Sequence, residues 1–236
     1  MVLVISHYYW VVAVFQPNLT SKLLLKAALK HLNVQYRDVL ELGCGSGWIT
    51  KQLLDEFGHQ THNWFLSDIS EEAIVESNTN LVPPLETRDI RVGDGFSPWV
   101  GDKFDFVIND IAGIADEIAI ASDWYNGVPF KAGVDGLLNT RNVLADLRSY
   151  LNPNGVFVAP VISLSNVVEY RELLSQTFGE VIFENKTPWP LPESLSVQSA
   201  LLQKLKKDEN IILEEKYGKV LAFTEVCICR FVKNGQ

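Results

Sequence analysis

A glycine-rich stretch at residues 41–47, Glu-Leu-Gly-Cys-Gly-Ser-Gly, has the composition of a turn that holds a small ligand against the main chain. Glycine turns tightly and lets a ligand approach the backbone, and the helix predicted from residue 48 offers unpaired N–H groups at its start. A dinucleotide-binding turn would carry its third glycine at position 48, where Trp48 stands, and no Gly-Lys-Ser/Thr of a phosphate-binding loop follows. The stretch matches neither of these phosphate-binding patterns, so its meaning depends on its surroundings.

Three carboxylates accompany this turn at the ends of predicted strands. Glu41 lies in the first predicted strand, Asp68 ends the second, and Asp94 follows the third. The carboxyl ends of the strands form the edge where open α/β sheets bind ligands. Each acidic residue alone is typical of an ordinary turn, but together with the glycine-rich stretch they predict one ligand site.

Short apolar strands alternate with helical stretches, which is typical of an α/β protein with a mainly parallel sheet. Ser70 and Ser165 have the residue type of helix N-caps. We expect a single domain over residues 1–236, made of an N-terminal arm and helix (1–37), a ligand-binding core (38–186), a proline-rich edge insertion (187–217) and a closing strand (218–236). Strands are predicted over residues 38–42, 64–67, 87–92, 104–108, 156–161, 180–184 and 220–232, and helices over 48–57, 70–80, 137–151 and 165–178.

The composition restricts the partners and the location. The 236 residues include 29 acidic and 20 basic side chains, a net charge of −9, whereas a nucleic-acid-binding surface needs an excess of Lys and Arg. The chain has three cysteines, Cys44, Cys227 and Cys229. They cannot form a disulfide framework and do not have the spacing of zinc ligands, which indicates a reducing, cytoplasmic location. The apolar residues 1–15 lack a basic start and are too short to span a bilayer, so we expect a strand or a packed arm there and no membrane segment.

The order of these motifs resembles class I S-adenosylmethionine-dependent methyltransferases over roughly residues 14–186. The resemblance implies a Rossmann-like, doubly wound sheet of seven strands, mainly parallel with an antiparallel last strand, and S-adenosyl-L-methionine as the cofactor. In this family the residue matching Glu41 binds the methionine part, that matching Asp68 holds the ribose hydroxyls, and that matching Asp94 lies beside adenine. The cofactor-binding residues implied by the resemblance are Glu41, Gly43, Cys44, Gly45, Gly47, Asp68, Ile69, Asp94, Gly95 and Asn109.

Within that superfamily, the sequence is most similar to the small-domain branch that includes protein glutamine N5-methyltransferases. Residues 104–109 resemble the strand leading to the branch's Asn-Pro-Pro-Tyr motif, and residues 132–137 resemble the stretch downstream of it. Asn109 matches the motif's Asn, whose side-chain amide binds the substrate nitrogen in that branch. The next three residues, Asp110-Ile111-Ala112, differ from Pro-Pro-Tyr, so the rigid turn and the aromatic side chain of the motif are missing.

Methyl transfer needs an aligned nucleophile and little acid–base machinery, because the sulfonium already activates the methyl group. An amine or hydroxyl acceptor still has to lose a proton, and Asp110 is the carboxylate placed to accept the hydrogen bond. We predict Asn109 and Asp110 as the substrate-facing catalytic pair, with a loop cap as the alternative role of Asp110. Aromatic residues are expected either to cover the methyl end of the cofactor or to pack in the core: Tyr8, Tyr9, Trp10, Phe15, Trp124, Tyr125 and Phe130.

The expected function is transfer of a methyl group from S-adenosyl-L-methionine to nitrogen or oxygen of a protein side chain or a small molecule. Two alternatives stay open. One is an RNA methyltransferase of the same fold, which the net charge of −9 disfavours. The other is a cofactor-binding partner subunit or scaffold without activity, which the loss of Pro-Pro-Tyr permits. We predict no metal site, and the sequence leaves the oligomeric state open.

Overall fold

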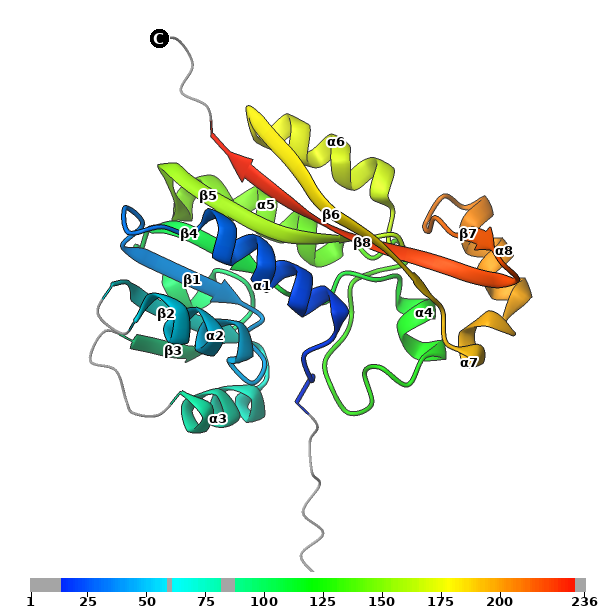
Figure 1. The fold of residues 1–236 in the computed structure, drawn as a ribbon, viewed down its shortest axis with the longest axis horizontal. Helices are drawn as coiled ribbons and strands as arrows, with labels where there is room; N and C mark the ends of the chain where they lie inside the picture. Colours follow the sequence, from blue (N-terminus) through cyan, green and yellow to red (C-terminus); the bar gives the residue numbers. More distant parts are fainter. Residues whose placement is uncertain (1–13, 59–60, 82–87, 232–236) are drawn as a thin grey trace, which may run out of the picture.

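One sheet organises the chain (Figure 1). The computed structural model describes residues 14–58, 61–81 and 88–231. Within them the sheet order is β3-β2-β1-β4-β5-β8-β6, and β7 pairs with β8 outside that path. The predicted arm at 1–13, with Tyr8, Tyr9 and Trp10, and the strand ends predicted at Thr87 and Val232 lie outside the described residues. The strands are β1 (Asp38–Leu42), β2 (Asn63–Asp68), β3 (Arg88–Val92), β4 (Phe104–Asn109), β5 (Leu151–Ile162), β6 (Glu180–Pro190), β7 (Glu214–Lys216) and β8 (Lys219–Arg230).

Helices connect most of these strands, and their ends follow local capping chemistry. Ser70 caps α3 as predicted, since its Oγ accepts a hydrogen bond from the Ala73 amide. The cap predicted at Ser165 is wrong, because α6 begins at Val167 and Asn166 supplies the capping oxygen to the Glu169 amide. The helices are α1 (Leu19–His31), α2 (Trp48–Phe57), α3 (Glu71–Asn80), the 3-10 turn η1 (Ser97–Trp99), α4 (Asp116–Ala121), α5 (Leu138–Tyr150), α6 (Val167–Thr177), α7 (Glu193–Ser196) and α8 (Ser199–Lys207).

At the centre of the sheet, strands are added on both sides of β1. β1 runs parallel to β2 on one side and to β4 on the other, and its last residue, Leu42, is in register with Ser67 and Asn109. The carboxyl ends of the three strands therefore lie side by side, with the loops after them diverging toward opposite edges. A reversal of strand order of this kind is where open α/β sheets form ligand crevices.

The far half of the sheet is antiparallel. The last strand, β8, lies between β5 and β6 and runs antiparallel to both. The predicted mainly parallel Rossmann-like sheet with an antiparallel last strand is confirmed, and the short β7 forms an additional hairpin with β8. Two strands are longer than predicted: β5 already begins at Leu151, and β6 continues through a bulge after Glu184 to Pro190. The first residues of the segment expected as an edge insertion therefore belong to the sheet.

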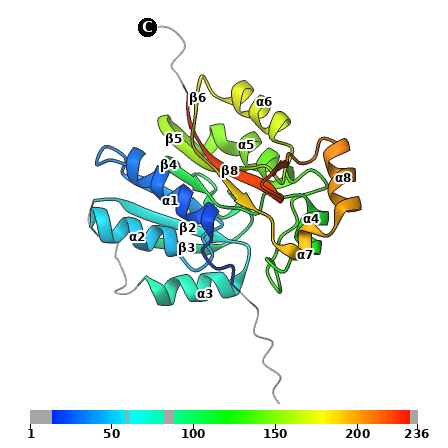
Figure 2. The same cartoon turned by 45° about the vertical axis from the view of Figure 1, so that its right-hand side comes forward.

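Apolar side chains on the two faces of the sheet explain the helix layers. α1, α2 and α3 cover one face, and α5 and α6 cover the other (Figures 1 and 2). Side chains alternate between faces along a strand, so Cys227 and Cys229 point toward the α5–α6 side, while Val226 and Ile228 pack on the α1–α2 side. Both thiols therefore lie on one face of β8 and pack in the core.

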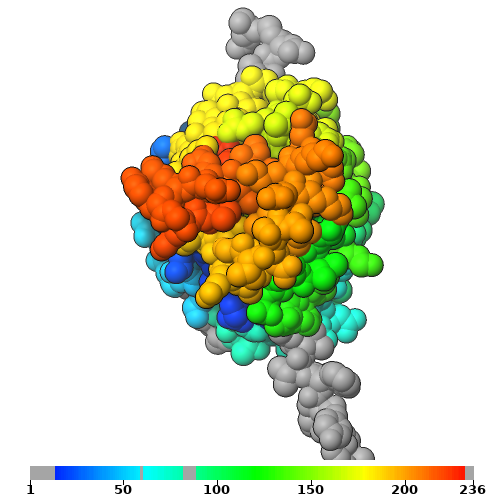
Figure 3. Space-filling model, turned by 90° about the vertical axis from the view of Figure 1, so that its right-hand side faces the viewer, coloured from blue at the N-terminus to red at the C-terminus, as the bar shows by residue number. Residues whose placement is uncertain are grey.

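A third, smaller core lies at the end of the molecule beyond the two main layers. Ile118 of α4, Leu195 of α7 and Leu205 of α8 belong to one buried apolar cluster. Figure 3 shows this end, where the orange residues of α7 and α8 lie beside the green segment around α4 and the red-orange hairpin of β7 and β8. The contact between Trp124 and Trp189, with ring centroids 5.9 Å apart, ties the loop after β4 to β6. The segment between β6 and β8 therefore packs on the loop that follows β4.

The described residues hold no group of three or more His, Cys, Asp or Glu side chains that could ligate a metal ion. The helices of the described ranges are all too short or too polar to cross a membrane. Cys44, Cys227 and Cys229 are buried free thiols.

Candidate functional site

A cavity of about 620 Å³ opens above the carboxyl ends of β1, β2 and β4. The N-terminal end of α1, the loop after β3, the loop between α4 and α5, and residues of α2, α5 and β5 also contribute to its wall. Two residues predicted for the site, Gly47 and Asn109, do not line it. The predicted site residues that do line it are Glu41, Gly43, Cys44, Gly45, Asp68, Ile69, Asp94, Gly95 and Asp110.

The glycine-rich turn takes a shape that side chains would obstruct. Gly43 has φ +71°, and a Cβ added there would lie 3.0 Å from the backbone of Asp110 and Ile111. Its amide donates to Ser67 O at 2.8 Å, which pins the turn to the end of β2. Gly47, with φ +73°, closes the turn by donating from its amide to Cys44 O at 2.8 Å. The structure thus gives Gly47 a place in the turn and in the packing against α3, away from the cavity.

Glu41 is the most deeply buried carboxylate of the site, with 2% of its surface exposed. Its Oε2 accepts hydrogen bonds from the amide of Thr50, at 3.1 Å, and from the Thr50 hydroxyl. Burial raises the pKa of Glu41 to about 8, and the nearby carboxylates of Asp110 and Asp68 add to the rise. A positive charge entering the cavity would favour the ionised form of this carboxyl.

Asp68 joins the end of β2 to the glycine-rich turn. Its Oδ2 accepts the Gly45 amide and its Oδ1 accepts the Ser70 amide, both at 2.9 Å. Each carboxylate oxygen has a second lone pair left for a ligand, and both oxygens are held at the cavity wall. Asp94 lines the same cavity after β3, where the amide of the preceding Gly93 donates to Asp68 O at 2.9 Å.

Asp110 lies at the end of β4, beside the glycine-rich turn. Its Oδ2 accepts a hydrogen bond from the Ser21 hydroxyl at 3.0 Å, and its amide donates to Leu42 O at 2.9 Å. Burial raises the pKa of Asp110 to about 7, the Ser21 hydrogen bond opposes that rise, and the charge of Asp68 adds to it. A carboxyl group with a pKa near neutrality can accept a proton at physiological pH.

Asn109 occupies a different position from the one predicted for a substrate-facing residue. It is 5% exposed and lies behind the cavity wall, where its Oδ1 has no hydrogen-bond partner within the described residues. Asn109 is the last residue of β4 and Asp110 directly follows it, and successive residues of an extended chain point to opposite faces of the sheet. The structure thus brings Asp110, and not Asn109, to the cavity.

Aromatic rings form part of the cavity wall beyond Asp110. Phe15 stacks on Tyr125 with ring centroids 5.3 Å apart, and Tyr125 lies 5.8 Å from Phe130. All three line the cavity, whereas Trp124 points away to Trp189. Burial raises the pKa of the Tyr125 phenol, and the Asp110 carboxylate contributes to the rise, so the phenol stays neutral beside that carboxylate.

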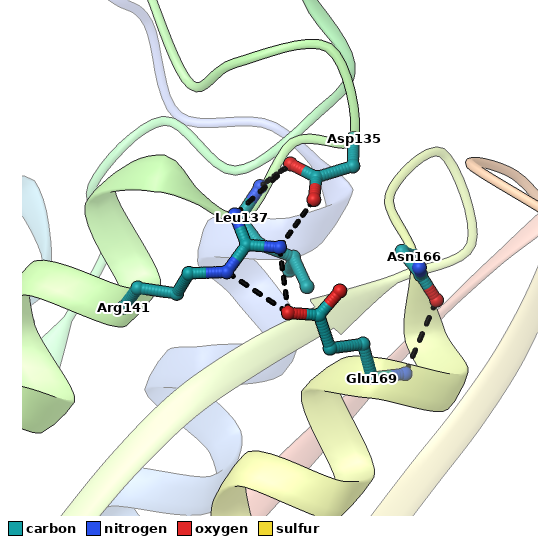
Figure 4. Close-up of polar contacts among 5 residues, drawn as sticks. All are labelled: Asp135, Leu137, Arg141, Asn166 and Glu169. Carbon is teal, nitrogen blue, oxygen red and sulfur yellow. Dashed lines mark hydrogen bonds and ion pairs between the residues drawn. The ribbon is translucent and has the colours of Figure 1, made fainter.

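A polar network holds the end of the loop that carries Tyr125 and Phe130. Arg141 of α5 bridges Asp135 and Glu169, with its Nε 2.9 Å from Glu169 Oε1 (Figure 4). Asp135 also accepts the Leu137 amide at 3.0 Å, and its carbonyl accepts the Asn166 amide at 2.9 Å. The network connects the end of the loop to both α5 and α6, and so fixes one wall of the cavity.

Several residues of the site are not evident from the sequence. Ser21 of α1 and Thr50 of α2 hold the carboxylates of Asp110 and Glu41 by hydrogen bonds. Asn139 donates to the carbonyls of Ala112 and Lys131, at 2.9 Å each, across the loop. Thr50 lies in the first turn of the helix that follows the glycine-rich turn, and this position is a signal that the sequence offers. No pattern in the sequence marks Ser21.

Comparisons with known proteins agree with this geometry. The family described as "Methyltransferase small domain" matches residues 13–110. A "Bifunctional methyltransferase" of Rickettsia prowazekii is 28% identical over 144 residues, which cover 58% of this chain and 27% of the relative. The chain thus spans about a quarter of the length of that curated relative.

Solved structures share the fold at low sequence identity. A ribosomal protein L11 methylase from Lactobacillus delbrueckii subsp. bulgaricus matches with a TM-score of 0.53 and 15% identity, over 93% of this chain and 82% of that one. Human Methyltransferase-like protein 13 in complex with SAH matches with a TM-score of 0.51 and 13% identity, over 91% and 82% of the two chains. The family match over residues 13–110 and the shared fold agree with the predicted methyltransferase fold.

Proposed function

We propose that this chain is an enzyme that transfers the methyl group of S-adenosyl-L-methionine to nitrogen or oxygen of a protein side chain or a small molecule. The observation that carries the proposal is the cavity at the carboxyl ends of β1, β2 and β4, which gathers a glycine-rich turn and four carboxyl groups, those of Glu41, Asp68, Asp94 and Asp110. Three free, buried cysteines suit a reducing compartment, and a cytoplasmic location is part of the proposal.

The residues present fit the proposed cofactor. S-adenosyl-L-methionine carries a sulfonium and an ammonium group, and the raised pKa of Glu41 marks a buried carboxyl that gains from a neighbouring cation. We assign the methionine part to Glu41 and the turn at Gly43–Gly45, the ribose to Asp68 with Ile69, and the adenine to Asp94 with Gly95. Cys44 is a small member of the turn, while Gly47 and Asn109 support the site from behind its wall.

In the proposed mechanism, the chain aligns the acceptor and excludes water. When bound, S-adenosyl-L-methionine supplies a methyl group already activated by its sulfonium sulfur. Asp110 accepts a proton or a hydrogen bond from the acceptor, and Ser21 orients its carboxylate. The rings of Phe15, Tyr125 and Phe130 keep water from the reacting atoms.

The proposal includes a similarity of this chain to the branch of protein glutamine N5-methyltransferases. Asn109 and residues 132–137 support it. The three residues that follow Asn109, Asp110-Ile111-Ala112, replace Pro-Pro-Tyr. They therefore lack the rigid turn and the aromatic side chain that enclose a planar amide in that branch. Glutamine is therefore not the acceptor that the cavity favours.

Calorimetry tests whether the chain binds the cofactor, which the methyltransferase and the inactive partner subunit both require. We expect S-adenosyl-L-methionine and S-adenosylhomocysteine to bind the purified chain, and Asp68→Asn to weaken both by about tenfold or more, because a carboxylate accepts hydroxyl hydrogen bonds more strongly than an amide. Asp55→Asn, an exposed acidic residue of α2, is the matched control and should bind as the unaltered chain does. No binding at millimolar cofactor would refute the proposal.

Transfer of a labelled methyl group into fractionated cell extract identifies the acceptor. Label in the protein or metabolite fraction supports the proposal. Label that ribonuclease removes indicates the RNA methyltransferase instead. Cofactor binding with no transfer to any fraction favours a partner subunit or scaffold without activity.

A further inference from the structure

The cavity wall holds more carboxyl groups than the cofactor's positive charge can pair with. It includes four carboxyl groups, those of Glu41, Asp68, Asp94 and Asp110, and among the described lining residues one basic side chain, that of the exposed Lys131. S-adenosyl-L-methionine brings a single net positive charge, because its carboxylate cancels one of its two cations. A second cationic group in the cavity would match the remainder.

Asp110 is the carboxylate left for that second group. Thr50 satisfies Glu41, and the turn and the Ser70 amide satisfy part of Asp68, whereas Asp110 receives one side-chain hydrogen bond, from Ser21. Its carboxylate also contributes to the raised pKa of Tyr125 in the loop between α4 and α5, and both residues line the cavity. This loop carries no residue assigned to the cofactor.

The rings beside Asp110 are suited to a cation as well. Phe15, Tyr125 and Phe130 form a continuous series of ring contacts at 5.3 and 5.8 Å, and all three line the cavity. Ring faces attract ammonium groups, and a carboxylate among rings binds an ammonium more strongly than a neutral amide or alcohol. The network around Arg141 holds the end of this loop against α5 and α6 (Figure 4), and Phe15 packs on the loop through its ring contact with Tyr125.

We propose that the methyl acceptor is a protonated amine, bound by the Asp110 carboxylate among the rings of Phe15, Tyr125 and Phe130. The inference rests on the proposed function and narrows its acceptor from nitrogen or oxygen to an amine nitrogen.

The chemical step balances with the groups named. The ammonium of the acceptor gives one proton to the Asp110 carboxylate, and the freed nitrogen lone pair forms a bond to the methyl carbon. The electron pair of the breaking carbon–sulfur bond stays on sulfur, which leaves S-adenosylhomocysteine and a methylated ammonium. Asp110 then releases its proton to solvent. The raised pKa of Asp110, about 7, brings the carboxyl closer to an amine than an ordinary aspartate would be.

Two probes that differ in one group test the inference. Benzylamine, an ammonium at pH 7.5, and benzyl alcohol share the ring and differ in charge. We would titrate each into the chain saturated with S-adenosylhomocysteine, after measuring the affinity for S-adenosylhomocysteine alone. Benzylamine should bind about tenfold or more tightly than benzyl alcohol. Asp110→Asn should reduce that preference to about twofold or less, because the charge is removed while the shape is kept.

A matched variant and the separate cofactor titration make the outcomes decisive. Asp123→Asn removes an exposed carboxylate of the same loop and should keep the preference for benzylamine. Equal affinity of the probes, a preference that survives Asp110→Asn, or no detectable binding of either probe would overturn the amine acceptor while the proposed function stands. Failure of S-adenosylhomocysteine itself to bind would remove the proposed function and the inference with it.

Discussion

The hydroxyl of Ser21 donates a hydrogen bond to Asp110 Oδ2 over 3.0 Å, joining the first turn of α1 to the end of β4. The two residues are 89 positions apart in the sequence. The bond favours the ionised form of Asp110, and so it lowers a pKa that burial raises. Ser21 is therefore a positioning residue for the carboxylate that we assign to the acceptor.

Ser21→Ala should raise the pKa of Asp110 above its value of about 7, by on the order of one unit, because the ionised carboxylate loses a donor. Carbon-13 NMR of the aspartate carboxyl groups measures the shift directly. The rate of methyl transfer should then need a higher pH to reach its plateau. Thr20→Ala is the control, since the Thr20 hydroxyl lies beside Thr224 and not beside Asp110. An unchanged Asp110 titration in Ser21→Ala would contradict the assigned role.

The cofactor-free chain should become less stable as the pH rises from about 6.5 to 8. Burial raises the pKa of Glu41 from 4.5 to about 8, so in this range the folded chain holds a proton that the unfolded chain has lost. The free energy of unfolding therefore falls with rising pH. Glu41→Gln, whose amide oxygen can accept both Thr50 hydrogen bonds, should flatten the dependence and melt several degrees higher at pH 8.5.

The melting temperatures of the unaltered chain and of Glu41→Gln are measured over this pH range. Saturating S-adenosyl-L-methionine should flatten the curve of the unaltered chain, because a bound cation favours ionised Glu41. A melting temperature of Glu41→Gln that runs parallel to that of the unaltered chain would show that another group causes the slope.

Gly43→Ala should destabilise the chain more than Gly218→Ala does. The two glycines have nearly the same φ, +71° and +69°, so the backbone strain of an alanine is similar. A Cβ at Gly43 would meet the backbone of Asp110 and Ile111 at 3.0 Å, whereas nothing lies within 4 Å of a Cβ at Gly218. Urea unfolding should show a difference of about 2 kcal/mol or more between the variants. Equal losses would mean that the backbone of the site shifts to admit the methyl group.

Arg141→Met should loosen the wall of the cavity without unfolding the sheet. The guanidinium bridges Asp135 and Glu169, and its loss leaves Asp135 with its backbone partner alone (Figure 4). Hydrogen exchange measured by mass spectrometry should speed up several-fold in the loop of residues 122–136, while β1 and β4 stay protected. Arg148→Met, on the same helix, removes a contact with Thr177 O and is the control. Equal exchange of the loop in the two variants would exclude a bracing role for Arg141.

The sequence alone determined the features that depend on neighbours along the chain. The glycine-rich turn follows from residue types that permit positive φ, and the alternation of strands and helices follows from apolar periodicity. Asp68 and Asp94 could be placed at strand ends for the same reason. In a parallel sheet the carboxyl ends of strands share one edge, so that placement already predicted a common site.

Only the tertiary structure decided how distant groups meet. The insertion of β8 between β5 and β6, and the continuation of β6 to Pro190, depend on pairing between strands far apart in sequence. The contact of Ser21 with Asp110 depends on how α1 packs over the sheet. Adjacent strand residues point to opposite faces, so the exact register of β4 sends Asp110 to the cavity and Asn109 behind it. Local chemistry thus specified the turn and the acidic edge, while packing chose which carboxylate faces the acceptor.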